Sequence, residues 1–369
     1  MRVGLMRLKY DQGGGAERSL GLLARGLLER GHQVHALVSA WEGLRPAGLD
    51  LRLVPTRGRG VARLKSFAAG AMDAASALSL DTCLSLERVP GAPVFRAGDG
   101  CHAAWLKRRS PYESFLKRLS FRFNPLHRGH LELERGVLTS PGLVRVIANS
   151  RLVAEELKAY YGLDEEKLKV VYNGVDEQRL NPARSKEARQ AARRELGLAP
   201  GEPALLFLGS GFERKGLAFA CAALPKLPKA KLLVAGRGRG APYQRLARRL
   251  GVAARVVFLG QRADAPRLLA AADALVLPTI YDPCSNACLE ALYVGAPVVT
   301  TLANGAAELI DQGVNGVLLK EPADPEALAE ACRQALALAR PFPQRVSTQS
   351  QWLDRVETLL LETVRGGAS

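Results

Sequence analysis

Short apolar segments alternate with longer amphipathic ones along most of the chain, and this alternation is the feature that most restricts its fold. Strand-like runs occur first at 2–8, 33–39, 51–55, 82–86, 143–148 and 168–171, and helical patterns at 16–30, 63–80 and 152–161 lie between several of them. Apolar strands separated by helices are typical of a parallel sheet that helices cover on both faces. The first part of the sequence therefore predicts a doubly wound α/β unit.

The same alternation begins again in the second half of the chain. Strand-like runs fall at 204–208, 231–235, 255–259, 274–277, 297–300 and 316–319, and helical patterns at 215–223, 243–250, 265–272, 285–293 and 325–338 separate them. The chain has 369 residues, and domains of about 100–200 residues are usual. We therefore predict two doubly wound α/β domains, residues 1–172 and 173–340, and a C-terminal segment 341–369 whose helical pattern packs back across the first domain.

The composition narrows the functional class without deciding it. Hydrophobic residues make up 47% of the chain, and no apolar run approaches about 18 residues, which speaks against disorder and against a membrane-spanning helix. The N-terminal sequence lacks the apolar run of a signal peptide, so we expect a cytoplasmic protein, and six scattered cysteines without a CxxC pair predict free thiols. The net charge of +16 favours an anionic partner, either nucleic acid, an acidic membrane surface or phosphorylated small molecules.

A glycine-rich segment follows the first predicted strand and opens the first predicted helix. It consists of Lys9-Tyr10-Asp11-Gln12-Gly13-Gly14-Gly15-Ala16. Three glycines let the backbone turn tightly and approach a ligand, while a helix N-terminus favours anions. The spacing is not the GxGxxG of dinucleotide-binding folds, and a plain strand-to-helix turn is the alternative interpretation.

A second glycine turn, Gly209–Gly216, follows the first strand of the second domain and carries Arg214 and Lys215. Adjacent cations near a helix start oppose the helix dipole. A bound diphosphate would reverse that effect, because Arg offers a planar fork and Lys a point charge. The pair is therefore a candidate clamp for a departing diphosphate, and a solvated basic turn is the alternative.

Two carboxylates eight residues apart, Asp282 and Glu290, lie just before and inside the predicted helix at 285–293. They share about the same face, and Glu290 is surrounded by apolar residues, where a carboxylate needs donors such as ribose hydroxyls. The first amides of this helix, at Asn286, Ala287 and Cys288, are candidates to meet a sugar or phosphate oxygen. A helix cap followed by a solvated glutamate is the alternative.

Two weaker candidates follow other predicted strands. Asp99 comes after the short run 94–96, at an edge where open α/β sheets bind ligands. The loop Gly236-Arg237-Gly238-Arg239-Gly240 follows the strand at 231–235 and is a candidate border for a nucleotide base. Each of these features is also consistent with an ordinary turn.

Several familiar motifs are missing from the sequence. It has no Walker A loop, GxSxG, HExxH or Asp-x-Asp motif, and its five histidines show no ligand spacing, so we expect neither a metal nor another cofactor. Three other functions stay open at this point: a nucleic-acid-binding protein, an NAD-dependent oxidoreductase and a two-domain nucleotide-sugar epimerase. The first two lack their motifs, whereas an epimerase would bind nucleotide sugars without needing an acceptor.

Taken in order along two similar domains, these segments resemble the retaining glycosyltransferases of family 4, and in particular the lipopolysaccharide core glucosyltransferase I group. The likeness covers nearly the whole chain. It rests on Lys9-Tyr10…Gly14-Gly15…Arg18, Ala40-Trp41-Glu42-Gly43, Gly209-Ser210…Arg214-Lys215-Gly216 and Leu289-Glu290-Ala291. The Glu-x7-Glu signature of the family stands here as Asp282-x7-Glu290, one methylene shorter, which puts the identity of the donor sugar in doubt.

The resemblance implies a fold, an activity and a role for each candidate residue. The fold is GT-B, with two Rossmann-like domains facing across a cleft, and the activity is transfer of a hexose from a UDP-linked sugar to a lipid-linked or lipopolysaccharide-core-like glycan. By this likeness Arg214 and Lys215 hold the diphosphate and Glu290 the ribose. The implied catalytic residues are Asp99, Arg214, Lys215 and Asp282, and the implied donor-binding residues include Gly14, Gly15, Asn286, Ala287, Cys288 and Glu290.

Residues 101–130 do not fit the alternation and form an insertion in the first domain. They carry a net charge of +6 and five interleaved aromatics, and Tyr112, Phe115, Leu116 and Leu119 share one helical face. A basic amphipathic helix with aromatic side chains is typical of peripheral membrane attachment, and a helix packed into the domain is the alternative. Because the enzymes that the chain resembles act on lipid-linked acceptors, we predict attachment to the anionic inner face of the cytoplasmic membrane and no nucleic-acid partner.

Overall fold

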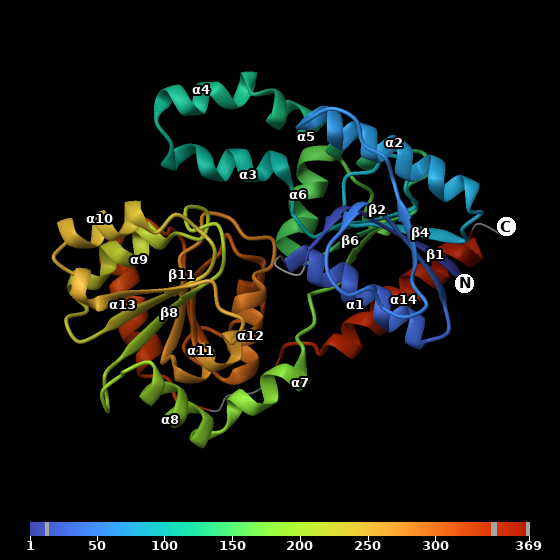
Figure 1. Ribbon diagram of the computed structural model, residues 1–369. Helices are drawn as coiled ribbons and strands as arrows, with labels where there is room; N and C mark the ends of the chain where they lie inside the picture. The colour runs from blue at the N-terminus through green and yellow to red at the C-terminus, as the bar shows by residue number, and fades with distance from the viewer. Residues whose placement is uncertain (12–14, 341–344, 367–369) are drawn as a thin grey trace. The chain divides into compact units, whose positions relative to one another are not determined.

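The computed structural model describes residues 1–11, 15–340 and 345–366. The chain divides into two compact units, of which unit 1 comprises Met1–Tyr172 with Ser350–Ser369 and unit 2 comprises Asn173–Gln349. Each unit is a parallel sheet with helices on both sides, as Figure 1 shows. The prediction of two Rossmann-like α/β units is therefore confirmed.

Unit 1 is built on a sheet of seven parallel strands in the order β3-β2-β1-β4-β5-β6-β7 among the described residues. The strands are β1 (Arg2–Tyr10), β2 (Gln33–Trp41), β3 (Asp50–Leu53), β4 (Thr82–Ser85), β5 (Val94–Ala97), β6 (Arg145–Ala148) and β7 (Leu168–Val170). The chain runs outward from β1 to β3 and then returns to β4 on the other side of β1. This reversal places the switch point of the sheet, where such folds bind ligands, between β1 and β4.

Helices bury both faces of this sheet. They are α1 (Gly15–Glu29), α2 (Val61–Ala77), α3 (His102–Arg109), α4 (Phe115–Phe123), α5 (Pro125–Leu138), α6 (Arg151–Tyr161) and α14 (Gln349–Gly366). Trp352, Val356 and Leu360 of α14 pack in one core cluster with α1 and the central strands. The C-terminal helix therefore completes unit 1, as the sequence predicts, and it lies beside α1 in Figure 1.

The insertion at 101–130 forms more than one helix. It contains α3, a short 3₁₀ turn at Ser110–Tyr112, α4 and the first part of α5. Tyr112 ends the 3₁₀ turn and Ser114 caps α4, so the expectation that Tyr112 shares a helical face with Phe115 and Leu116 is wrong. The cause is Pro111, which lies within the 3₁₀ turn after α3, and the extended backbone of Glu113, which separates the two helices.

Unit 2 repeats the plan with six parallel strands in the order β10-β9-β8-β11-β12-β13 among the described residues. The strands are β8 (Ala204–Leu208), β9 (Lys231–Ala235), β10 (Val256–Gly260), β11 (Ala274–Leu277), β12 (Val298–Thr301) and β13 (Gly316–Leu319). The helices are α7 (Glu177–Leu180), α8 (Lys186–Glu195), α9 (Leu217–Ala223), α10 (Ala241–Arg249), α11 (Ala265–Ala271), α12 (Asn286–Val294) and α13 (Pro325–Leu336). Its switch point lies between β8 and β11.

Candidate active site

The glycine turn after β8 lies at the switch point of unit 2. Gly216 has a φ of 81°, and a Cβ at this position would lie 1.9 Å from the carbonyl oxygen of Pro278, the residue after β11. Only glycine fits both the backbone angle and the contact. The Arg214 carbonyl accepts from the amide of Ile280 at 2.9 Å and from Thr279 Oγ1 at 2.9 Å. The turn is therefore fixed to the loop that follows β11.

This contact brings Arg214 and Lys215 to Asp282. Lys215 Nζ donates to Asp282 Oδ2 at 2.7 Å and to Ser285 Oγ at 3.3 Å. Arg214 Nη1 donates to the Tyr281 carbonyl at 2.8 Å and lies 3.4 Å from Asp282 Oδ2. Lys215 and Asp282 are only 8% and 5% exposed, whereas the Arg214 side chain is 35% exposed. Three of the predicted catalytic residues thus form one largely buried charged group.

Asp282 is ionised in this group. Burial alone would raise the pKa of Asp282, but the adjacent Lys215 and Arg214 outweigh burial and lower the pKa below its ordinary value. Both contacts go to Oδ2, which leaves Oδ1 to accept from a ligand hydroxyl. Lys215 has three N–H donors and uses two, so one remains for an anionic ligand.

Three of the four ligand-binding residues that the sequence predicts on α12 are partly accessible to solvent. Asn286 and Ala287 are half-buried, and Glu290 is half-buried one turn further along. Cys288 differs, because its side chain is fully buried and its amide donates to the Ser285 carbonyl at 3.0 Å. The prediction of a free amide at Cys288 is therefore wrong, since this helix closes its first turn on Ser285.

The segment that precedes the first strand of unit 2 contacts α12 through side chains that sequence reasoning did not select. Arg179 of α7 pairs with the Glu290 carboxylate. Asn173 Nδ2 donates to Asn286 Oδ1 at 2.7 Å, and Tyr293 Oη donates to Asn181 Oδ1 at 2.8 Å. These contacts hold the face of α12 that carries Asn286 and Glu290.

Asn304 is a second residue that sequence reasoning missed. It is 1% exposed, and its Oδ1 accepts from the amides of Ser285 at 3.2 Å and Ala306 at 3.1 Å. Its Nδ2 donates to Thr300 Oγ1 at 3.0 Å. The backbone of Asp282 also bonds on both sides of Asn304, from its amide to Ala303 and from its carbonyl to Gly305. Asn304 therefore positions the loop between β11 and α12.

Asp99 lies at the equivalent edge of unit 1. It follows β5 and its side chain is 50% exposed, with Oδ2 3.5 Å from Arg7 Nη1. Arg7 comes from β1 and also contacts Glu87, which follows β4, at 3.3 Å. Arg7, Glu87 and Asp99 thus surround the switch point between β1 and β4. Burial tends to raise the pKa of Asp99, but Arg7, Arg88 and Arg96 outweigh it and lower the pKa.

Below Asp99, a buried carboxylate ties the insertion to unit 1. Glu134 of α5 is fully buried and accepts from Arg88 Nη2 at 2.9 Å, from Tyr161 Oη at 2.6 Å and from the amide of His102 at 2.9 Å. The His102 amide is the first of α3, and the side chain of the N-cap residue Cys101 makes no capping bond to it. Glu134 therefore supplies the cap of α3 from a neighbouring helix.

Three of the five histidines gather beside this carboxylate, which their spacing in sequence did not predict. His102 Nε2 lies 3.1 Å from His127 Nδ1, and the rings of His102 and His130 have centroids 5.0 Å apart. Burial, with Arg88 and the neighbouring rings, lowers the pKa of His102 to about 3. Within the described ranges, no three His, Cys, Asp or Glu side chains have the geometry to hold a metal ion.

The two other glycine-rich segments that the sequence singles out occur after β1 and after β9. Gly14 lies outside the described residues, and Gly15 is the first residue of α1. The loop Gly236–Gly240 lies beside the glycine turn Gly209–Gly216, because the Arg237 amide donates to Ser210 Oγ at 3.3 Å. No helix in the described part of the chain has the length and apolar character needed to cross a membrane.

Comparison with known proteins decides the family. Residues 13–179 match the model described as Glycosyltransferase Family 4, and residues 202–337 match the model described as Glycosyl transferases group 1. The chain therefore carries a Glycosyltransferase Family 4 domain followed by a Glycosyl transferases group 1 domain. It is a GT-B glycosyltransferase, and the transferase is related to other enzymes that use nucleotide sugars.

Individual relatives agree with this assignment. The transferase is 28% identical to the lipopolysaccharide glucosyltransferase WaaG of Escherichia coli K12 over 91% of its own length and 90% of the length of WaaG. A crystal structure of WaaG matches it with a TM-score of 0.79 at 25% identity, over 99% of this chain and 94% of that one. Anabaena HepE, solved with UDP and glucose, shares the fold with a TM-score of 0.73 at 22% identity, over 98% and 99% of the two chains.

Proposed function

We propose that this glycosyltransferase moves a hexose from a UDP-sugar to a lipid-linked or lipopolysaccharide-core-like glycan, with retention of configuration. The observation that carries the proposal is the buried group of Lys215, Arg214 and Asp282 at the switch point of unit 2. The likeness to a lipopolysaccharide glucosyltransferase, and to a neighbour solved with UDP and glucose, supports the choice of donor and acceptor.

The group supplies what departure of a diphosphate requires. Arg214 and the third N–H of Lys215 would stabilise the negative charge that grows on the diphosphate as its bond to C1 of the sugar breaks. Asp282 Oδ1 would accept from a sugar hydroxyl and so orient the ring. For retention, the acceptor oxygen bonds to C1 on the face that the diphosphate leaves, and its proton passes to the departing phosphate oxygen.

Two other carboxylates complete the proposed roles. Glu290 would accept from the ribose hydroxyls, and because Arg179 already pairs with it, Arg179 would orient the carboxylate during binding. Asp99 would contact the acceptor from unit 1, where its lowered pKa keeps it an acceptor of hydrogen bonds at neutral pH. The half-exposed side chain of Asp99 is compatible with contact to a ligand.

A ligand panel tests the donor. Stability is measured by thermal shift with UDP, GDP, ADP and their sugars, and we expect UDP compounds to stabilise most, by about 2.7 kcal/mol at 100 times Kd. Release of UDP from a UDP-hexose should then depend on a glycan acceptor. Stabilisation by another nucleotide alone would refute the uridine assignment, and conversion of the donor without an acceptor would favour an epimerase.

We propose that no metal takes part, because Arg214 and Lys215 supply the cationic charge that a metal would otherwise bring to the diphosphate. Activity should therefore be unchanged after treatment with EDTA. Loss of activity that magnesium or manganese restores would contradict this part of the proposal.

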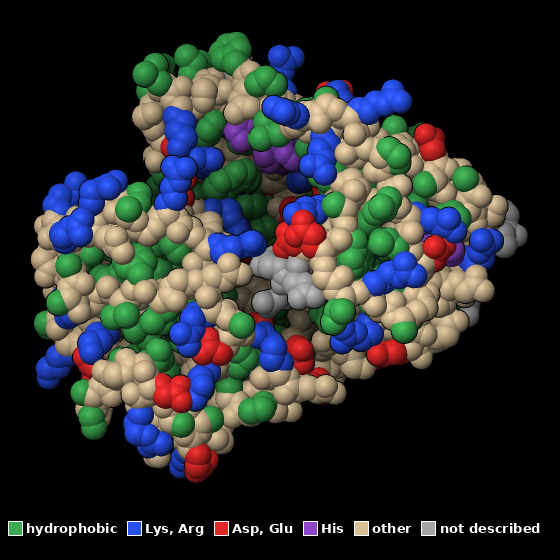
Figure 2. All heavy atoms as spheres, in the orientation of Figure 1, with side chains coloured by type: hydrophobic (Ala, Val, Ile, Leu, Met, Phe, Trp, Pro, Cys, Tyr) green, Lys and Arg blue, Asp and Glu red, His purple; other side chains and the backbone are tan. Residues whose placement is uncertain are grey.

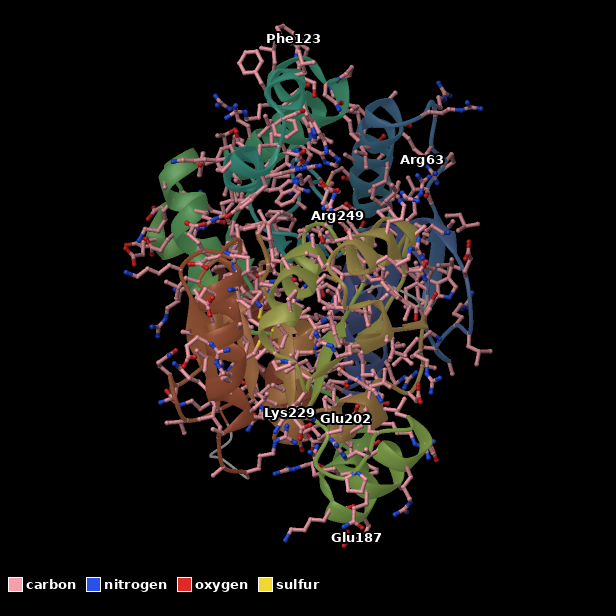
Figure 3. All side chains as sticks on the ribbon, turned by 90° about the vertical axis from the view of Figure 1, so that its left-hand side faces the viewer. Arg63, Phe123, Glu187, Glu202, Lys229 and Arg249 are labelled. Atoms are coloured by element: carbon pink, nitrogen blue, oxygen red, sulfur yellow. The ribbon has the colours of Figure 1, made fainter. Side chains whose placement is uncertain are left out.

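We propose also that α4 attaches the enzyme to an anionic membrane at the cytoplasmic face. Phe115, Leu116 and Phe123 are 69%, 77% and 70% exposed, and Lys117 and Arg118 lie among them. Figure 3 shows Phe123 extending outward from α4. An apolar face beside basic residues is the arrangement that inserts shallowly between anionic lipids.

Vesicle sedimentation tests this attachment. The variant Phe115→Ser, Leu116→Ser, Phe123→Ser should bind anionic vesicles much more weakly than the parent. A matched control, Leu44→Ser, Leu53→Ser, Val144→Ser, removes three exposed apolar side chains elsewhere in unit 1 and should sediment like the parent. Equal sedimentation of all three proteins would overturn the assignment of α4.

A further inference from the structure

The net positive charge of the chain is confined to two segments. Residues 101–130 carry +6, and residues 214–263 carry twelve Lys or Arg and no Asp or Glu. Because the whole chain has a net charge of +16, the remaining 289 residues sum to −2. The proposed function uses the first segment but only Arg214 and Lys215 of the second.

Half of the twelve cations in the second segment are used inside unit 2. Arg214 and Lys215 contact Asp282, and Arg255 donates to backbone carbonyls. Three others form ion pairs: Lys226 with Glu326, Lys231 with Glu202, and Arg262 with Asp264. The other six are exposed and have no acidic partner among the described residues. Five of these six are defined here as the arginine face: Arg237, Arg239, Arg245, Arg248 and Arg249.

The arginine face is centred on α10. Arg245, Arg248 and Arg249 lie on its outer side, one turn apart, while Ala247 faces the core. Arg237 and Arg239 lie in the loop that leads into the N-terminus of α10. Figure 2 shows Lys and Arg side chains gathered on the surface over this helix, at the left of the view.

The stability of α10 does not by itself explain this clustering of arginines. Like charges three and four residues apart on a helix repel each other, and cations at a helix N-terminus oppose the helix dipole. Arg245 therefore repels Arg248 and Arg249 along α10, and the two loop arginines before the helix oppose its dipole. Arg248 and Arg249, in contrast, lie in the last turn, where the dipole favours cations. An external anionic surface would turn both effects into favourable ones, and guanidinium groups bind phosphates in a bidentate way.

We propose that the arginine face docks on an anionic lipid surface and forms a second membrane contact besides α4. This inference rests on the proposed membrane attachment, since a bilayer is the partner that takes both an apolar helix and a layer of phosphates. A nucleic acid fits the face less well. Tyr243 of α10 packs its ring against Phe212, and no aromatic residue is among the largely exposed apolar side chains described in unit 2 to stack on a base.

Charge reversal on α10 tests the inference in the full chain. The test variant is Arg245→Glu, Arg248→Glu, Arg249→Glu, which leaves Arg237 unchanged because it lies beside the glycine turn that carries Arg214 and Lys215. A matched control, Lys186→Glu, Arg194→Glu, Lys320→Glu, changes the charge equally at exposed sites of unit 2 outside the arginine face. Binding is measured to vesicles of phosphatidylglycerol and phosphatidylcholine, and to phosphatidylcholine alone.

We expect the test variant to bind anionic vesicles at least about tenfold more weakly than the parent, since each Arg near an anionic surface adds roughly fivefold. Its binding should also depend less on salt, while the control binds like the parent. Unchanged thermal stabilisation by UDP in the test variant shows that unit 2 is folded and that the face does not serve the donor. A loss of that stabilisation in a folded variant would overturn the inference.

The outcomes separate this inference from the proposed function. If the test variant binds anionic vesicles as the parent does, the inference is wrong while attachment through α4 stands. If the α4 variant binds anionic vesicles normally and the test variant does not, the role of α4 is wrong and the arginine face remains the membrane contact. Selective loss of binding to a single-stranded oligonucleotide, with vesicle binding intact, would identify a nucleic-acid surface and overturn the inference.

Discussion

Lys215 and Asp282 neutralise each other in a nearly dry environment, so the function of each depends on the other. Replacing Lys215 by Ala removes one cation of the proposed diphosphate site and leaves Asp282 with Arg214 alone. Loss of one such contact at the transition state should cost about 3 kcal/mol, or roughly 100-fold in kcat/KM. Steady-state kinetics of Lys215→Ala measure this, with Lys186→Ala as an exposed control. Turnover within a few-fold of the parent would contradict the clamp.

Glu290 should act on binding rather than on the chemical step. Ribose contacts exist in both the ground state and the transition state, so Glu290→Gln should raise the Kd for UDP while kcat changes little. Asp282→Asn, in contrast, should lower kcat or alter the choice of sugar, because Asp282 would contact the transferred group. Calorimetry with UDP distinguishes the two, and unchanged UDP affinity in Glu290→Gln would remove Glu290 from the ribose site.

At the scale of single residues, the sequence showed which side chains have suitable chemistry, but it did not show which of them contact each other. Arg214, Lys215 and Asp282 were selectable because glycine turns and strand ends mark where α/β sheets bind ligands. Their pairing was not, because 67 residues separate Lys215 from Asp282 and only the order of β8 and β11 brings them together. Arg179 and Asn304 carry no local signal at all, since their importance arises from contacts that the fold creates.

At the scale of elements, the α3–α5 insertion should make the protein sensitive to acid. His102 has its pKa lowered to about 3 by burial, with Arg88, His130 and His127 adding to the effect. Between the usual histidine pKa of about 6.5 and this value, the unfolded chain binds a proton that the folded chain does not. Stability therefore falls as pH falls through this range.

Urea unfolding at a series of pH values measures the effect. His102→Gln cannot take up that proton when it unfolds. Its free energy of unfolding should therefore fall less steeply than that of the parent between pH 6.5 and pH 4, because an unfolded histidine titrates at about pH 6.5. Parallel curves for the two proteins would show that His102 does not cause the acid sensitivity. Burial of His102 was not predictable, because the turn at Pro111 and the Glu134 cap decide how α3 meets α5.

For the whole molecule, the alternation of strands and helices was enough to predict two doubly wound units, because each parallel sheet needs helices on both faces. The periodic apolar residues Trp352, Val356 and Leu360 also predicted that the last helix returns to unit 1. The clustering of basic residues was visible in the sequence as well, but the sequence did not show which of these residues are exposed and unpaired. Only the structure separates the cations that are paired within unit 2 from those that are exposed on α10.

The return of α14 makes the stability of unit 1 depend on residues at the far end of the chain. Leu360 is fully buried among side chains of α1 and the central strands, so Leu360→Ala should lower the free energy of unfolding of unit 1 by about 3 kcal/mol. Arg355→Ala, on the exposed side of the same helix, should change it by less than about 0.5 kcal/mol. UDP should stabilise both variants as it does the parent, because its proposed site lies in unit 2. Equal unfolding of the two variants in urea would show that α14 does not contribute to the core of unit 1.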